Sequence, residues 1–206
     1  MQDAVADKMK KIIALTIIFI IYAVLIKTCP IITVWDKSVI VYVQNMLSHV
    51  PLYLPLLPDC KLYVIMLSIP MIFGFAYFFK RKDWYRFLLL ISISAVAFLI
   101  NCILKSVVCR IRPPYELQLA IHPDSYSFVS SHSLTTMCLY GLTILYVVKY
   151  CSNKFIRILT IVLSIAWILF VGISRIWLGV HYPTDVIGAY LLGFIILMIY
   201  YGISKR

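Results

Sequence analysis

Residues 174–185 read Ser174-Arg175-Ile176-Trp177-Leu178-Gly179-Val180-His181-Tyr182-Pro183-Thr184-Asp185, a short polar segment between two long apolar runs. Polar side chains beside runs that can span a membrane are costly to keep there, so they are functional candidates. Arg175 offers a planar fork of donors for an oxyanion, His181 a nitrogen that can attack or carry a proton, and Asp185 a carboxylate that can orient that ring. These residue types together predict chemistry on a phosphate group.

The composition of the whole chain indicates a membrane protein. Of its 206 residues, 63% are hydrophobic and 13% are charged, and the mean hydropathy is +0.98, far above that of a soluble domain. A helix needs about 20 apolar residues to cross about 30 Å of hydrocarbon. We therefore expect an all-α, polytopic membrane protein with six transmembrane helices in one bundle, at Ile12–Lys27, Leu62–Phe79, Phe87–Leu104, Ser133–Val148, Ile156–Ile173 and Val186–Ile203.

The longest segment outside these spans follows the first of them. Its residues 31–47 mix apolar and polar side chains and could form an amphipathic helix on the outer membrane surface, after which Pro51, Pro55 and Pro58 break any helix. This segment could admit a lipid substrate or serve only as a connector. Because no repeat, linker or low-complexity tract interrupts the chain, we expect a single domain over residues 1–206.

The net charge of +11 indicates membrane topology rather than nucleic-acid binding. Six spans place 12 of the 19 cationic residues on one side, namely Lys8, Lys10, Lys11, Lys80, Arg81, Lys82, Arg86, Lys149, Lys154, Arg157, Lys205 and Arg206. The positive-inside rule puts that side, with both termini, in the cytoplasm. The first span should remain attached, because its end lacks the small-x-small cleavage pattern of a signal peptide.

Neither the cysteines nor the acidic residues follow a metal-binding pattern. The six cysteines lack C-x-x-C spacing, and Cys29 and Cys60, at the ends of the first outward loop, could form a disulfide or remain thiols. The carboxylates that face outward are Asp36, Asp59, Glu116, Asp124 and Asp185. None is paired at a spacing typical of a magnesium or two-metal site. We expect no metal and no other cofactor, and activity that survives a chelator.

Polar residues gather at the outward ends of four successive spans. They are Lys105, Arg112, Ser130, Ser131, His132, Arg175, His181 and Asp185. Helix N-termini there present unpaired N–H groups and partial positive charge, which favour an anion. Capping or snorkelling could explain each residue singly, but not three cations, two histidines and a carboxylate at one pole. We expect these residues to form one phosphate-binding cup.

This pattern resembles the three-part signature of the type-2 phosphatidic acid phosphatase superfamily. The parts are Lys105-x6-Arg112-Pro113, Ser130-Ser131-His132 and Ser174-Arg175-x5-His181-x3-Asp185. The family includes membrane lipid phosphatases, undecaprenyl-diphosphate phosphatases and soluble vanadium haloperoxidases. The middle part differs from the usual Pro-Ser-Gly-His, because Val129 replaces the proline and Ser131 the glycine. Ser131 keeps a backbone N–H, but its side chain leaves a phosphate less room to approach that N–H than glycine would.

The resemblance implies a role for each matched residue. His181 would attack phosphorus and form a phosphohistidine, Asp185 would fix its ring, and His132 would protonate the leaving oxygen. The phosphate-binding set would be Lys105, Arg112, Ser130, the Ser131 amide and Arg175. A bell-shaped pH profile follows, because the acid must be protonated and the nucleophile neutral.

The implied activity is removal of a terminal phosphate from a lipid at the outer face of the cytoplasmic (inner) membrane. The compact chain resembles bacterial members that act on undecaprenyl diphosphate, with lipid A, phosphatidylglycerophosphate and phosphatidic acid as alternatives. An alternative function of another class is a non-catalytic protein that binds or transports lipid phosphates, which the departures at Val129 and Ser131 would fit. A vanadate-dependent oxidase would need a soluble fold, which the hydropathy excludes. The oligomeric state and the role of Arg110 stay open.

Overall fold

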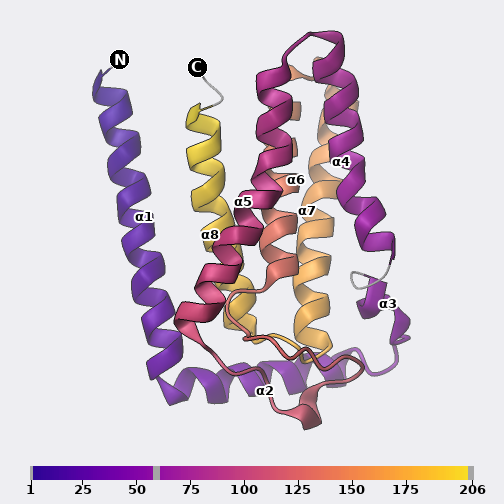
Figure 1. Cartoon of the computed structure of the whole chain (residues 1–206). Helices are drawn as coiled ribbons and strands as arrows, with labels where there is room; N and C mark the ends of the chain where they lie inside the picture. Colours follow the sequence, from indigo (N-terminus) through magenta and orange to yellow (C-terminus); the bar gives the residue numbers. More distant parts are fainter. Residues whose placement is uncertain (1, 58–60, 204–206) are drawn as a thin grey trace.

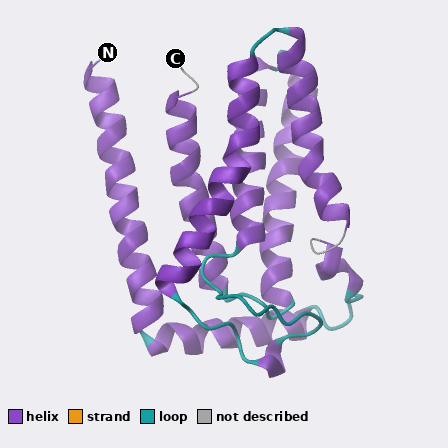
Figure 2. Ribbon diagram, in the orientation of Figure 1, coloured by secondary structure: helices purple, strands orange, loops and turns teal. Residues whose placement is uncertain are grey.

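The computed structural model describes residues 2–57 and 61–203, and over these residues its regular secondary structure is helical throughout (Figure 2). Six long helices coincide with the six expected spans, which confirms the all-α, polytopic fold. They are α1 (Gln2–Thr28), α4 (Lys61–Lys80), α5 (Trp84–Val108), α6 (Ser131–Tyr150), α7 (Lys154–Trp177) and α8 (Pro183–Ile203). Five are long and apolar enough to cross a membrane over their described residues, while α4 contributes the shorter apolar segment Leu67–Lys80.

Most helices extend a few residues beyond the expected spans, and the extensions of α1, α5 and α7 are the longest. The charged segment before Ile12 is helical, because α1 begins at Gln2, and an exposed i,i+4 ion pair joins Lys11 to Asp7 there at 2.8 Å. At the other pole, α5 and α7 run further than expected, so Lys105 and Arg175 lie within their last turns rather than after them. A cation in the last turn interacts favourably with the C-terminal end of the helix dipole.

Helix α2 (Pro30–Met46) lies across one end of the bundle, where the sequence allowed an amphipathic helix (Figure 1). Pro30 occupies its first turn, where a backbone N–H is not needed. The face toward the bundle buries Asp36 and Ile40, while Trp35 and Tyr42 are exposed. An amphipathic helix placed in this way can lie at the membrane surface.

The segment after α2 departs from the expectation that its prolines exclude a helix. Residues Tyr53–Leu56 form the single turn α3, with Pro55 inside it. A proline is compatible with a first helical turn, because the N–H groups there lack helical partners. The Cys29–Cys60 disulfide left open by the sequence lies outside the described residues, because it requires Cys60.

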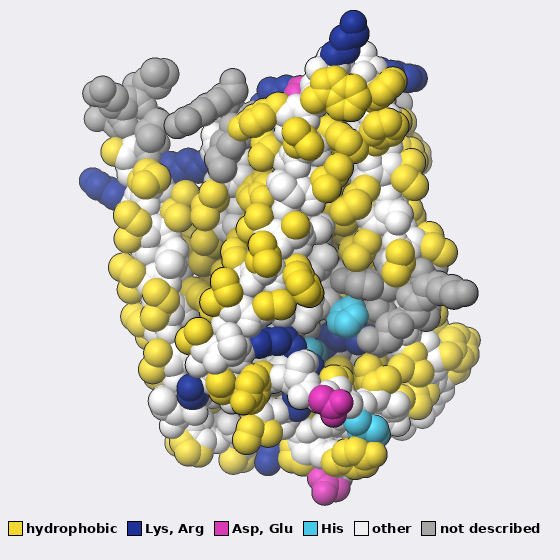
Figure 3. Space-filling view, viewed as in Figure 1, with side chains coloured by type: hydrophobic (Ala, Val, Ile, Leu, Met, Phe, Trp, Pro, Cys, Tyr) yellow, Lys and Arg dark blue, Asp and Glu magenta, His cyan; other side chains and the backbone are white. Residues whose placement is uncertain are grey.

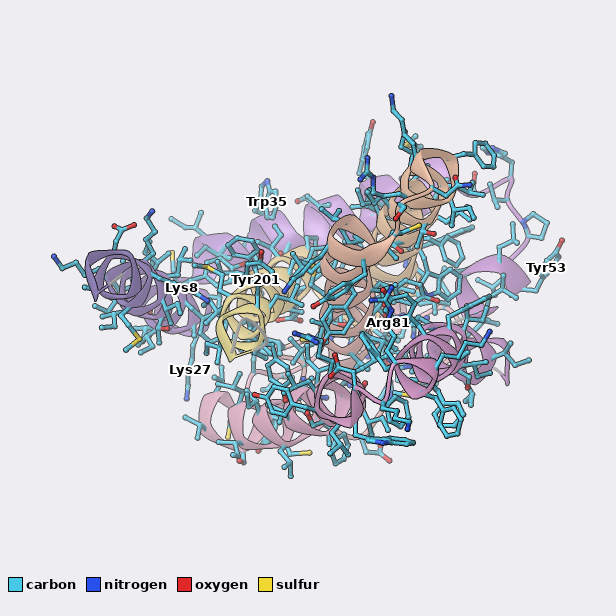
Figure 4. The ribbon with its side chains drawn as sticks, turned by 90° about the horizontal axis from the view of Figure 1, so that it is seen from above. Lys8, Lys27, Trp35, Tyr53, Arg81 and Tyr201 are labelled. Carbon is cyan, nitrogen blue, oxygen red and sulfur yellow. The ribbon has the colours of Figure 1, made fainter. Side chains whose placement is uncertain are left out.

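The two poles of the bundle differ in character. Both ends of the chain and the α4–α5 and α6–α7 turns lie at the pole opposite α2 (Figure 1). Figure 4 looks down on that pole, where Lys8 of α1 lies 5.8 Å from the centre of the Tyr201 ring of α8. The loops 109–130 and 178–182 lie at the α2 pole. The basic turns and the predicted cup are therefore at opposite ends of the bundle.

Helix α6 lies at the centre of the bundle and packs against α5, α7 and α8. Its inward side chains Leu134, Cys138, Leu139 and Leu142 are completely buried. Apolar side chains are spread along the flank of the bundle seen in Figure 3, as expected of a surface in contact with lipid. In lipid, such helices are held together by close packing rather than by exclusion of water.

Candidate active site

The turn between α7 and α8 brings the His181 ring close to the Asp185 carboxylate. Gly179 makes this turn with φ +68, and the N–H groups of Val180 and His181 both donate to Arg175 O, at 3.2 and 3.3 Å. This arrangement satisfies a carbonyl that the end of α7 leaves free. Pro183 then starts α8, and Asp185 lies in its first turn. His181 Nδ1 is 3.7 Å from Asp185 Oδ2.

Replacing Gly179 by alanine should destabilise this turn. A positive φ costs a residue with a side chain about 1–2 kcal/mol, and a Cβ here would lie 1.8 Å from Leu117 O, which also accepts from Gln44 Nε2. We expect a lower unfolding temperature in detergent. Gly202→Ala is the matched control, because its Cβ meets the mobile tip of Lys8. Equal unfolding temperatures for the two variants would contradict the assigned turn.

The Asp185 carboxylate is fully buried and held at both oxygens. Oδ2 accepts from Ser127 Oγ at 2.5 Å and from the Tyr182 N–H at 2.9 Å, and Oδ1 accepts from Arg110 Nη1 at 2.6 Å. Ser127 Oγ is also 3.4 Å from His181 Nδ1. A carboxylate fixed in this way can orient an imidazole. The 3.7 Å separation is compatible with that role, since catalytic hydrogen bonds are often long without substrate.

The contact between Arg112 and His181 defines the tautomer of the imidazole. Arg112 Nη1 lies 3.2 Å from His181 Nε2 and donates to Val180 O at 2.5 Å. A guanidinium has only donors, so Nε2 must accept and the neutral ring carries its proton on Nδ1, toward Asp185. Burial lowers the pKa of His181 to about 3, and Arg112 adds to this effect, while the Asp185 carboxylate opposes it. The imidazole is therefore neutral near pH 7, as a nucleophile must be.

Lys105 shares a hydrogen-bond partner with Arg112, the cation beside Nε2 of His181. Arg112 Nε donates to Ser125 O at 2.7 Å, and both Arg112 Nη2, at 3.0 Å, and Lys105 Nζ, at 3.1 Å, donate to Ser125 Oγ. Burial lowers the pKa of Arg112 to about 10, which leaves it cationic at neutral pH. Figure 3 shows Lys, Arg and His side chains gathered below the apolar surface, near the α2 pole. The structure thus brings together Lys105, Arg112, His181 and Asp185.

The N-terminus of α6 lies beside that of α8. Ser130 caps α6, and its own N–H donates to Asp185 O at 3.4 Å. His132 is half-buried in the first turn of α6 and is thereby carried to the same pole. The Ser131 hydroxyl donates to Asn101 Oδ1 on α5 at 3.1 Å. This hydroxyl is therefore held by α5, while the Ser131 N–H remains at the open end of the helix.

Arg175 has a different environment from Lys105 and Arg112. Its side chain is 1% exposed, its Nη2 donates to Pro55 O of α3 at 3.0 Å, and its Nε donates to Ser174 Oγ at 3.2 Å. Nη2 carries a second N–H, so a phosphate oxygen could accept from it without displacing the Pro55 carbonyl.

Several residues of the site were not predicted from the sequence: Asp36, Arg110, Ser125 and Ser127. The sequence pattern could have indicated that Asp36 is buried. Positions 32, 36 and 40 fall on one helical face, and the other two are isoleucines. Ser125 and Ser127 lie in a loop whose pattern indicates no partner. Among the residues that the structure describes, no group of three or more His, Cys, Asp or Glu could hold a metal ion. Metal independence stays a prediction.

Comparisons with known proteins extend the resemblance. The family model of the PAP2 superfamily matches residues 84–206, more than half of the chain. Phosphatidylglycerophosphatase B of Bacillus subtilis (strain 168) is 33% identical over 143 residues, 68% of each protein. The crystal structure of a transmembrane PAP2 type phosphatidylglycerolphosphate phosphatase from Bacillus subtilis matches with a TM-score of 0.77 and 27% identity, covering 95% of this chain and 96% of that one. The chain belongs to the PAP2 superfamily and is a membrane lipid phosphatase.

Proposed function

We propose that this enzyme removes the terminal phosphate of phosphatidylglycerophosphate through a phosphohistidine on His181. The observation that carries the proposed chemistry is the geometry of that imidazole, whose Nδ1 faces Asp185 and whose Nε2 lies 3.2 Å from a cation. The substrate is supported by the names of the two similar proteins from Bacillus subtilis. Undecaprenyl diphosphate, favoured from the sequence, has no such support and stays an alternative.

The proposed reaction has two steps that share one acid–base group. Nε2 of His181 attacks phosphorus, the bond from phosphorus to the glycerol oxygen breaks, and protonated His132 gives that oxygen its proton. Water then attacks the phosphohistidine, His132 takes a proton from the water, and the N–P bond breaks to release phosphate. Asp185 stabilises the positive charge on the phosphorylated ring, because the Nδ1 proton faces its carboxylate.

The remaining site residues would bind the phosphate oxygens. Lys105 and Arg112 supply positive charge, Ser130 and the Ser131 amide a helix N-terminus, and Arg175 a further guanidinium. Phosphoryl transfer depends mainly on such positioning and on fixed charge around the equatorial oxygens. The non-catalytic alternative has less support, because α5 holds the Ser131 hydroxyl and leaves the helix end open. We also propose that this pole faces outward and both termini lie in the cytoplasm.

Phosphate release from four lipids tests the substrate. Purified protein in detergent is assayed against phosphatidylglycerophosphate, undecaprenyl diphosphate, phosphatidic acid and lipid A, with His181→Ala as the inactive control. We expect the highest kcat/KM with phosphatidylglycerophosphate. Higher kcat/KM with another of these lipids would overturn the proposed substrate and leave the proposed reaction standing.

The bell-shaped pH profile expected from the sequence should have no acid limb between pH 7 and pH 5. Because the pKa of His181 lies at about 3, below its ordinary value, the neutral ring persists as the pH falls from 7 to 5. We expect kcat/KM to fall at alkaline pH, as the general acid loses its proton, and to remain high in mild acid. The substrate phosphate titrates near pH 6, so its ionisation is measured separately by 31P NMR. A loss of activity near pH 6.5 beyond that caused by ionisation of the substrate would contradict the neutral state assigned to His181.

A further inference from the structure

Arg110 lies between two buried carboxylates that belong to different helices. Its Nη1 donates to Asp185 Oδ1 at 2.6 Å and its Nη2 to Asp36 Oδ2 at 2.7 Å. Arg110 is 6% exposed, and both aspartates are 0% exposed. The guanidinium also stacks on the Tyr182 ring, 4.3 Å from its centre. Burial would lower the pKa of Arg110, but Asp185 and Asp36 raise it, so the group stays cationic.

Asp36 also holds the residue next to Asp185. Its Oδ1 accepts from the Thr184 N–H at 3.0 Å, and its Oδ2 accepts from Thr184 Oγ1 at 2.6 Å. Thr184 Oγ1 in turn accepts from Arg110 Nη1 at 2.8 Å. Both carboxylates, both Nη atoms of Arg110 and the Thr184 hydroxyl therefore have partners, as burial of charge requires. The N-terminus of α8, from which Asp185 projects, is thus fixed to α2.

We infer that Asp36 is a positioning residue of this enzyme, which acts through Arg110 and Thr184 to fix the Asp185 carboxylate beside His181. The inference rests on the proposed role of His181 as nucleophile. It makes α2 part of the catalytic apparatus, whereas the sequence allowed it to be a plain connector.

The physical reason is the sharing of one positive charge by two negative ones. While Asp36 takes part of the Arg110 charge, Asp185 keeps enough negative charge to stabilise the cation that forms on the phosphorylated ring. Without the Asp36 charge, Arg110 would neutralise Asp185 and draw it away from His181. A displacement of about 1 Å can cost about 100-fold in rate. Substrate affinity should change little, because neither Asp36 nor Arg110 lies in the proposed phosphate-binding set.

Asp36→Asn tests the inference, because it removes the charge and keeps the size of the side chain. We expect kcat to fall between about 10-fold and about 100-fold with KM nearly unchanged, and a rapid quench should show an equal fall in the rate of phosphohistidine formation. Ser38→Ala is the matched control on the same helix, since Ser38 Oγ donates only to Val34 O, at 3.1 Å. This control should retain both kinetic constants.

A purely structural role for Asp36 would give a different result. A lower unfolding temperature with unchanged kcat in Asp36→Asn would overturn the inference. If Asp36→Asn does not fold, Asp36→Glu keeps the charge but moves the carboxylate by one methylene, and kcat equal to that of the wild type would then overturn it. A phosphoenzyme in His181→Ala would instead overturn the proposed nucleophile, and the inference with it.

Discussion

Replacement of His181 by alanine is expected to lower kcat for lipid phosphate hydrolysis by about 10⁴-fold or more. The imidazole is proposed to form the covalent bond to phosphorus, and the cations Lys105 and Arg112 cannot attack phosphorus in its place. The binding of inorganic phosphate should persist, because the proposed phosphate-binding residues remain. The variant separates a catalyst from a protein that only binds lipid phosphate.

Two measurements check this result. Rapid acid quench with 32P-labelled substrate should trap a labelled protein in the wild type and none in His181→Ala. The inhibition constant of added phosphate, measured on the wild type, should equal the dissociation constant of phosphate measured directly on the variant. His122→Ala is the control, because that exposed histidine stacks on Tyr115 at 3.9 Å in an outer loop. Turnover by His181→Ala at a rate near that of His122→Ala would exclude the phosphohistidine.

The helices, and the gathering of several predicted site residues at one pole, were predictable because they depend on local patterns. Apolar runs of membrane-spanning length marked the six long helices, and charged turns separated them. The spacing within three short motifs identified Lys105, Arg112, His181 and Asp185, which the structure brings to one pole. Hydropathy could not indicate the helical segment before Ile12, because it is polar and its backbone needs no membrane to form a helix.

The pairing of the residues that support the nucleophile could not be predicted from one sequence. Asp36 and Arg110 are 74 residues apart, and Arg110 and Asp185 are 75 apart. No local period or motif links such positions, so the pairing exists only once α2 crosses the bundle below α8. Asp36 was therefore one of several outward carboxylates in the sequence, and Arg110 had no assigned partner. The parts of the site that were missed are those made by tertiary contact.

Arg112→Lys is expected to lower kcat/KM by about 100-fold, and Arg112→Ala by about 1,000-fold. All three guanidinium nitrogens of Arg112 are engaged, with Ser125 O, Ser125 Oγ and Val180 O as acceptors. A lysine keeps the charge but cannot reproduce this planar fork, and alanine also removes a cation beside the reacting phosphorus. Arg81→Lys is the control, because Arg81 lies at the opposite pole above the Tyr77 ring, at 4.7 Å.

The pH dependence of Arg112→Ala separates the two contributions of the guanidinium. Its positive charge disfavours protonation of His181, although less than burial does, so its removal should raise the pKa of that ring from about 3. A larger fraction of the nucleophile is then protonated in mild acid, so the acid limb of kcat/KM should move to higher pH than in the wild type. Arg112→Lys keeps a cation there and should retain the wild-type profile at a lower level. If Arg112→Ala loses activity equally at every pH, Arg112 binds phosphate without setting the charge state of His181, and burial alone keeps the ring neutral.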